Sequence, residues 1–167
     1  MAKEKKDVKD APKNEEKIPM PALQITAQYV KDLSFEAPHM PLTLLEMQTQ
    51  PPKIDISIDV KAQKADKEKP VYTVDLIIKA NAHINGKSAF ICELTYGALV
   101  SLNLPQEHHQ PVLLIEVPHL MFPFARSIIA NATREAGFAP LALAPIDFSA
   151  LYRQRMEQYA KSKKEEN

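Results

Sequence analysis

The sequence predicts an α+β fold: a four-stranded antiparallel sheet, with a long crossover loop and two helices packed on one face. Two observations lead to this prediction. Apolar residues recur at every second position between Gln24 and Leu102, which is typical of half-buried antiparallel strands. After Asn103 they recur at every fourth position, as along one face of an amphipathic helix. Strands followed by helices in a chain of 167 residues favour one α+β domain.

Each of the four expected strands has one apolar row, whose members should face the same side of the sheet. Lys31 interrupts the first row. The members of the first row are Ile25, Ala27, Tyr29, Leu33 and Phe35. The other three rows run from Ile54 to Val60, from Tyr72 to Ile84 and from Phe90 to Ala98. The residues between them are mostly polar or charged, so we expect one covered face and one open face.

The connections between these strands differ in kind. Asn85 and Gly86 lie between the third and fourth rows, and this dipeptide is a strong signal for a tight hairpin. The looser stretch from Asp66 to Lys69 joins the second row to the third. The stretch from Pro38 to Pro52 contains four prolines and is too long for a hairpin turn, so we expect a crossover loop.

Two helices are expected after the sheet. Leu120 and Phe124 begin the apolar stripe of the first helix, which should end at Gly137, a residue suited to the left-handed cap. Pro118 and Pro123 require its early part to start late or to kink.

The second helix should begin near Asp147 or Ser149, since both are good N-caps. Residues 21–160 are then one domain, between a charged N-terminal tail (1–20), expected to be disordered, and a short charged C-terminal tail (161–167).

Composition limits the possible functions. Basic residues number 21 and acidic residues 21, so the formal net charge is zero, which argues against a nucleic-acid binder. The N-terminus lacks the apolar stretch of a signal peptide, and no run approaches the length of a membrane span. A lone cysteine rules out an intrachain disulfide and suits a reducing compartment. We therefore expect a cytoplasmic protein without direct membrane insertion.

The sequence shows no motif for covalent chemistry. Its three glycines cannot build a phosphate-binding loop, and no serine lies in a nucleophile elbow. Cys92 lies in a strand without a second cysteine nearby, so we expect a buried core thiol. His108 and His109 are expected to be solvated surface residues, with a chance metal pair as the alternative. We expect no enzyme activity, cofactor or metal.

Two surfaces remain for a binding function. The outward row contains several acids, among them Asp55 and Asp75; they form either an ordinary solvated face or a docking surface for a basic partner. The crossover loop is unusually apolar. Its Leu42, Leu44 and Leu45 either pack into the core or stay partly exposed as a binding groove or an oligomer contact.

Four runs in this chain resemble the SecB family of export chaperones. They keep the family's order and spacing from about residue 23 to residue 155. The runs are DLSFEAP at 32–38, FICE at 90–93, PHLMFPFAR at 118–126 and GFAPLALAPIDF at 137–148. The resemblance implies a homotetramer, assembled as a dimer of dimers. It also implies a holdase that binds unfolded precursor proteins and delivers them to the SecA translocation ATPase.

The resemblance also assigns roles to residues. These roles are expectations that the family implies for this chain. The SecA-binding positions are Asp32, Glu36, Ile91 and Glu93, all on the outward face. The client-binding groove is Leu42, Leu44, Leu45, Phe138, Phe148 and Tyr152. The oligomer interface is supported by Cys92, Leu94 and Tyr96.

One departure from the family affects the groove. Many relatives have a tryptophan in the crossover loop, whereas this chain has none and places Met47 or a neighbour there. Two other functions remain open at this point. One is a related chaperone dedicated to a toxin–antitoxin system, and the other is an enzyme or small-ligand carrier on the same fold.

Overall fold

The computed structural model describes residues 20–165, and the side chains of 162–165 are not placed; the expected N-terminal tail and most of the C-terminal tail lie outside the described residues. Four strands form one antiparallel sheet in the order β1-β4-β3-β2. The strands are β1 (Leu23–Glu36), β2 (Lys53–Lys64), β3 (Val71–Ile84) and β4 (Lys87–Leu102). The crossover places β1 beside β4, so β1 and β2 are the two edges of the sheet.

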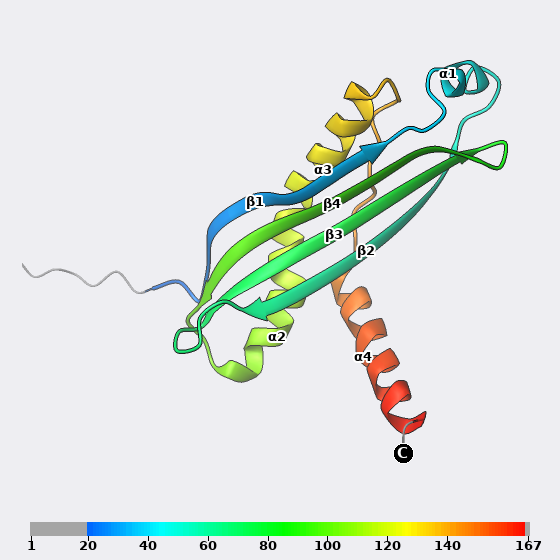
Figure 1. Cartoon of the computed structure of the whole chain (residues 1–167). Helices are drawn as coiled ribbons and strands as arrows, with labels where there is room; N and C mark the ends of the chain where they lie inside the picture. The colour runs from blue at the N-terminus through cyan, green and yellow to red at the C-terminus, as the bar shows by residue number, and fades with distance from the viewer. Residues whose placement is uncertain (1–19, 166–167) are drawn as a thin grey trace, which may run out of the picture.

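The helical part begins after β4. The segments are η1 (Gln106–His108), α2 (His109–Pro111), η2 (Val112–Glu116), α3 (Val117–Glu135) and α4 (Phe148–Glu165), and a short α1 (Leu42–Glu46) lies in the crossover. In Figure 1 the stretch from α2 to α3 runs behind the sheet, and the near face of the sheet has no helix over it. The α+β sheet and its covered face are therefore as the sequence predicts.

The core lies between the sheet and α3. The inward residues of β3 and β4 are almost all buried, and Met121, Phe122, Ala125 and Ile129 of α3 pack onto them. The continuous helical stretch 106–135 is long and apolar enough to cross a membrane by composition, contrary to the expectation from sequence. Its buried face identifies it as the core helix of this fold.

The prolines explain the irregular start of this stretch. Residues Val112–Glu116 form a π-helical segment directly before Pro118. A proline within a helix lacks the N–H and its ring clashes with the carbonyl four residues earlier. Widening the turn before Pro118 relieves the clash at that residue, so the helix continues through Pro118 instead of starting after it, and Pro123 lies inside α3.

The predicted turns and caps are confirmed. Asn85 and Gly86 both have positive φ angles, 50° and 74°, as the tight hairpin requires. Gly137 has a φ of 89° and follows the end of α3. Asp147 caps α4, because its carboxylate accepts the Ala150 N–H at 2.9 Å.

The prediction for the first strand was partly wrong. Register shifts occur in β1 between Ile25 and Ala27 and again between Val30 and Asp32. Each β-bulge adds a residue and moves the following side chains to the other face. Tyr29 therefore lies opposite Gly97 on the open face, Ala27 faces the same way, and Val30 takes the inward place opposite Tyr96.

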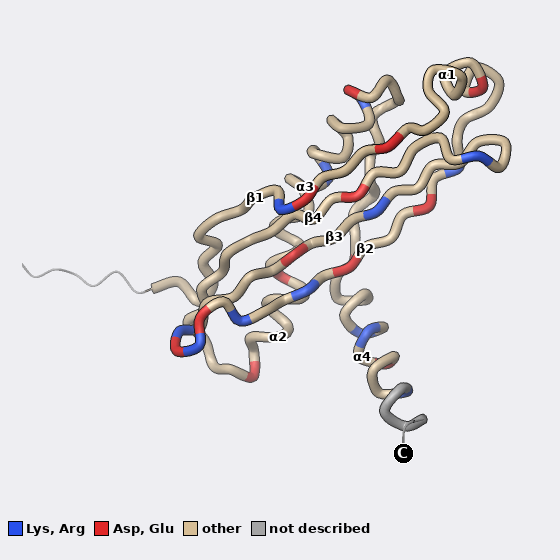
Figure 2. Tube along the Cα trace, viewed as in Figure 1, with Lys and Arg blue, Asp and Glu red and all other residues tan. Residues whose placement is uncertain are grey.

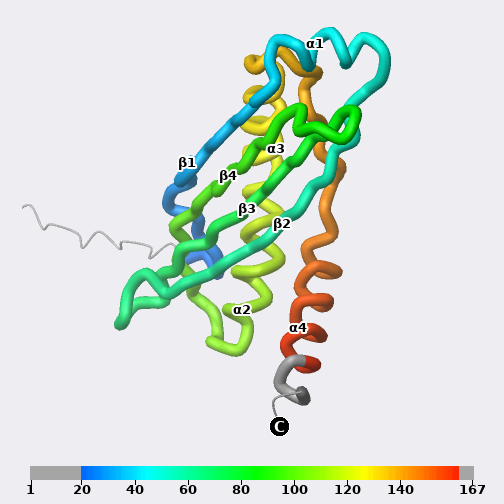
Figure 3. The backbone as a smooth tube through the Cα atoms, turned by 45° about the vertical axis from the view of Figure 1, so that its right-hand side comes forward, coloured from blue at the N-terminus to red at the C-terminus, as the bar shows by residue number. Residues whose placement is uncertain are grey.

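The position of α4 also differs from expectation. Figures 1 and 3 both show α4 beyond the β2 edge rather than over the middle of the sheet. Its first residue, Phe148, packs on Phe122 with ring centroids 6.0 Å apart. Further along, α4 contacts η2, Arg155 reaches β2, and residues between Tyr152 and Ala160 border a groove.

Candidate functional site

The open face of the sheet brings the four expected SecA-binding residues together. Asp32 and Glu36 lie on β1, and Ile91 and Glu93 lie on the neighbouring β4. Glu36 pairs directly with Ile91 across the two strands. Figure 2 shows where the acidic positions lie along these strands, and the strand pairing places the side chains of these four residues on the open face. All four side chains are at least partly exposed, so a partner protein can reach them.

This face also contains basic residues that neutralise some of the acids. Lys79 contacts Glu93 at 2.8 Å, and Lys31 contacts Asp75 at 2.5 Å. The hydrogen bond to Asp75 and the charge of that carboxylate raise the pKa of Lys31 above its ordinary value. Asp32 and Glu36 are both exposed on β1, so this edge contributes acidic side chains that a partner can reach.

The crossover loop is fixed to the turn between β3 and β4. Glu46 contacts Lys87 at 3.6 Å and accepts a hydrogen bond from the Asn85 amide at 3.4 Å. Gln50 donates a further hydrogen bond to the Asn85 side chain. These contacts hold α1 at one end of the sheet, as Figure 1 shows. The loop therefore has a defined position without being buried.

The apolar loop residues divide between the core and the surface. Met40 and Met47 are partly buried and pack against the core. Leu42 and Leu45 are 64% and 62% exposed, and Leu44 is 38% exposed. The two methionines thus pack against the core, whereas the three leucines stay exposed; their use as a groove or an oligomer contact stays a prediction. The three leucines form an exposed apolar patch, which we call the α1 patch.

The remaining groove residues do not join the α1 patch. Phe138 packs edge-on against Phe90 and at a tilt against Phe35, with ring centroids 4.8 Å and 6.0 Å away, and is 6% exposed. Phe148 is 2% exposed. Only Tyr152 lines a groove, at a different end of the molecule. Phe138 and Phe148 are therefore core residues and offer almost no surface for contact with a client.

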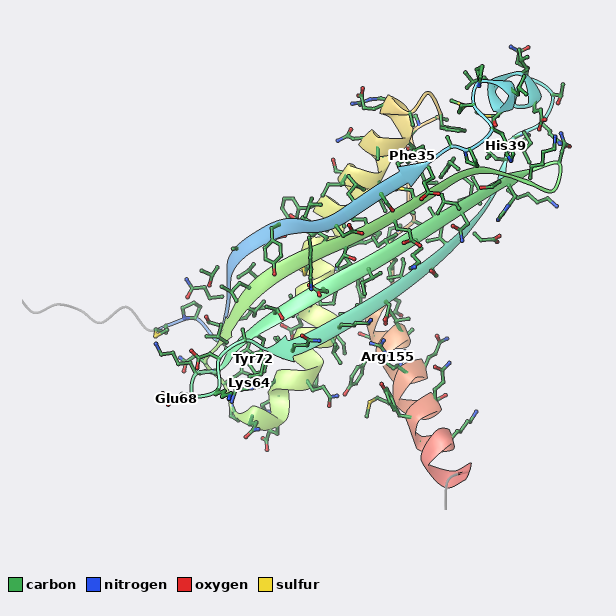
Figure 4. The ribbon with its side chains drawn as sticks, in the orientation of Figure 1. Phe35, His39, Lys64, Glu68, Tyr72 and Arg155 are labelled. Carbon is green, nitrogen blue, oxygen red and sulfur yellow. The ribbon has the colours of Figure 1, made fainter. Side chains whose placement is uncertain are left out.

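The groove at Tyr152 has a volume of about 960 Å³ and lies between α4, the 106–116 segment and the end of β2. Its walls contain three tyrosines and several aliphatic side chains. Apart from Tyr152, the residues that line it were not predicted from the sequence as groove residues; they include Val60, Tyr72, His109, Leu113, Arg155 and Met156. Figure 4 places Tyr72 and Lys64 at the hairpin end and Arg155 on α4. We call this the α4 groove.

His109 is not the solvated residue that the sequence suggested. Its Nδ1 lies 2.8 Å from the Tyr72 hydroxyl, and its Nε2 lies 2.9 Å from the Leu104 carbonyl oxygen. A carbonyl oxygen can only accept, so Nε2 donates to it, and both ring nitrogens have a hydrogen-bond partner. His108 is exposed and 3.4 Å from Glu107, so the two histidines do not act as a pair.

Comparison with known proteins identifies the family. The family model described as preprotein translocase subunit SecB matches residues 16–159. The protein-export protein SecB of a Bradyrhizobium strain is 50% identical over 149 residues, covering 88% of this chain and 90% of that protein. The chain belongs to the SecB family. The SecB protein of Rhodospirillum rubrum is 49% identical over 135 residues, covering 81% of this chain and 82% of the other.

A solved structure shows the same fold at low identity. It is a SecB-like chaperone of Mycobacterium tuberculosis in complex with a peptide from an antitoxin. It covers 75% of this chain and 88% of its own, with a TM-score of 0.60 and 11% identity. At that identity the likeness supports the SecB fold alone.

The three expected interface residues of this SecB-family chain lie inside the protomer. Cys92 and Leu94 are fully buried and Tyr96 is 8% exposed, on the covered face of β4, the strand against which α3 packs. Burial raises the pKa of the Cys92 thiol, which makes it a poor nucleophile. An effect of this row on assembly would therefore pass through α3.

Proposed function

We propose that this SecB-family chain holds unfolded precursor proteins in the cytoplasm and delivers them to the SecA ATPase. The observation that supports this best is the separation of two unlike surfaces on one small fold. The open sheet face gathers Asp32, Glu36, Ile91 and Glu93, while the α1 patch and the α4 groove are apolar and lie elsewhere. One surface suits a folded protein partner and the others suit exposed client side chains.

Holding requires no covalent step. A protein that binds only the unfolded state shifts the folding equilibrium of its client by mass action. Burial of about 500 Å² of apolar client surface contributes roughly 12 kcal/mol before the cost of ordering the client. That cost leaves a moderate affinity at each surface, and several surfaces in one assembly would raise the total by avidity.

The assembly we propose is a homotetramer, a dimer of dimers. Exposed apolar residues on the covered side of the sheet support it, because a monomer would leave them in water. They are Val30 and Leu33 on β1, and Leu120 and Phe124 on α3, each between 44% and 54% exposed. A second copy covering this side would bury them.

A chaperone dedicated to an antitoxin is the weaker alternative. The relatives at 44–50% identity are all named protein-export proteins, whereas the antitoxin-bound structure is only 11% identical. The sequence of this chain therefore favours the export function.

Replacing two α1 patch residues tests client holding. Leu42→Ser with Leu45→Ser should reduce the delay that the protein imposes on aggregation of an unfolded precursor. Both side chains are exposed, so the fold should be unaffected. Met20→Ser, which changes an equally exposed apolar residue far from the patch, is the control. If wild-type protein does not delay aggregation at all, the proposed function is wrong.

A further inference from the structure

Arg155 attaches α4 to the exposed edge of the sheet. Its guanidinium donates from Nη1 to the backbone carbonyl of Val60 and from Nη2 to the carboxylate of Asp59. The same Asp59 carboxylate accepts the Val60 N–H at 2.9 Å. Together, Arg155 and Asp59 occupy both backbone groups of Val60. Figure 4 shows Arg155 beside β2, in the first half of α4.

The backbone N–H and carbonyl of Val60 belong to the free edge of β2. Ala65, just after β2, donates its N–H to the Val71 carbonyl of β3 at 2.8 Å. The odd-numbered residues of β2 therefore direct their backbone groups toward β3. Alternate residues of an edge strand direct their backbone groups away from the sheet. The even-numbered residues of β2, from Ile54 to Ala62, therefore present their N–H and carbonyl groups at the edge, as Val60 does.

Arg155 lies where two apolar regions meet. On one side is the α4 groove, which includes Val60, Ala62 and Arg155 among its walls. On the other side the edge continues toward Ile56 and Ile54, which are 44% and 37% exposed. The guanidinium thus lies between the α4 groove and the free edge of β2 and separates the two. Arg155 is 33% exposed, so an incoming chain can reach it.

We propose that Arg155 is a gating residue, which an extended segment of an unfolded client must displace to bind along β2. The proposal rests on the client-holding function. An extended unfolded segment has unpaired backbone N–H groups that can replace the guanidinium at the Val60 carbonyl. Its alternate side chains would lie over Ile54, Ile56 and the α4 groove. A folded protein has few unpaired N–H groups, so the gate discriminates against it.

The first test removes the guanidinium and keeps the aliphatic stem. Arg155→Met should bind a short, labelled, extended peptide of alternating apolar and polar residues about tenfold more tightly than wild type. In the variant, the peptide no longer has to break the hydrogen bond from the charged Arg155 guanidinium to Val60. A difference of about 1.4 kcal/mol in binding free energy corresponds to a factor of ten in affinity. Arg153→Met, on the exposed face of the same helix, should leave the affinity unchanged.

A modified peptide tests whether the released carbonyl is used. The same peptide N-methylated at alternate residues cannot donate along one edge. If the methylated residues are those whose N–H groups face β2, the Arg155→Met variant should bind this peptide no more tightly than wild type does. If the intervening residues are methylated instead, the increase in affinity should remain. Equal binding of both methylated peptides would overturn the role of the Val60 carbonyl.

The outcomes separate this proposal from the proposed function. If wild type delays precursor aggregation but Arg155→Met binds the peptide no more tightly, or more weakly, the gate is wrong and the holdase stands. If wild type neither delays aggregation nor binds the peptide, both fail. Should Arg155→Met not fold, Asp59→Asn weakens the same contact and keeps the arginine. It should bind about threefold more tightly, since a neutral acceptor forms a weaker bond, and no change would overturn the gate.

Discussion

Thr133 joins the end of α3 to the segment that follows it. Its side chain is fully buried, and its hydroxyl lies within 3.1 Å of the carbonyl oxygens of Ile129 and Ala130. The same oxygen accepts the Leu141 N–H at 2.9 Å. A single hydroxyl thus satisfies a backbone group of the segment that leads from α3 to α4.

Replacing Thr133 by valine should be costly although the two side chains have nearly the same shape. Thr133→Val leaves the Leu141 N–H without its acceptor, and this should lower the free energy of unfolding by about 1–3 kcal/mol. Urea unfolding followed by circular dichroism measures the change. Thr133→Ser retains the hydroxyl and should lose less; a valine variant as stable as wild type would contradict this role.

Single residues also show where sequence periodicity fails. Tyr29 was assigned to the covered face by alternation, but two bulges in β1 place it over Gly97 on the open face. A bulge depends on how the partner strand is paired, which no period within one strand contains. His109 was misjudged for a similar reason, because its partner Tyr72 is distant in sequence and is brought near only by the fold.

Among the structural elements, the open sheet face makes the clearest prediction. Reversing the charges of Asp32 and Glu93 together, as Asp32→Lys with Glu93→Lys, should weaken binding to SecA roughly tenfold or more at low salt. Holding of an unfolded precursor should be unchanged, because the α1 patch lies elsewhere. Titration calorimetry with purified SecA measures the affinity.

A control on the same face shows whether position matters. Asp55→Lys changes an acid at the far β2 edge and should have a much smaller effect. Unchanged SecA affinity in the double variant at low salt would refute the assignment of this face.

The α4 helix depends on its N-cap. Asp147→Ala removes the acceptor for the Ala150 N–H and should cost about 1 kcal/mol of helix stability. Amide hydrogen exchange should then be faster in the first turns of α4, while the sheet is unaffected. Asp147→Asn keeps an acceptor and should exchange almost as wild type. Equal protection in the alanine variant would show that packing of Phe148 alone fixes the start of the helix.

The four strands, the hairpin and the two long helices followed from the sequence, whereas α1, the helical segments before Val117 and the placement of α4 did not. Alternation gave four strands, Asn85 and Gly86 gave the hairpin, and Gly137 and Asp147 marked helix ends. The position of α4 beside β2 depends on Arg155 and Phe148, whose partners are distant in sequence. The α4 groove exists only because of that placement, so it could not be predicted.

At the scale of the whole molecule, the row beneath α3 should influence assembly. Cys92 has no exposed surface and lies among close neighbours, so a larger side chain cannot fit without moving α3. Leu120 and Phe124 on the outer side of that helix are the residues we propose to meet another copy.

Cys92→Tyr should therefore shift tetramers toward dimers or monomers. Light scattering coupled to gel filtration measures the mass. Cys92→Ser, which changes little volume, is the control and should stay tetrameric. An unaltered mass in the tyrosine variant, with native circular dichroism, would count against transmission through α3.

The site was predicted in unequal parts. The open face was reached from alternation and from the family resemblance, and the structure brings its four residues onto adjacent strands. The groove residues were taken from the resemblance, and the structure separates them into the α1 patch, two core aromatics and Tyr152. Where a strand has no bulge, alternation shows which face a residue takes, but it does not show which helix will cover that face.

The central claim is that one protein binds unfolded precursors and SecA at different surfaces. The most direct measurement is the native mass of the purified protein, alone and with an unfolded precursor and SecA. The account predicts a tetramer alone, a complex with the precursor, and a larger complex that contains all three. Failure to bind the precursor, or competition between precursor and SecA for the same surface, would contradict it.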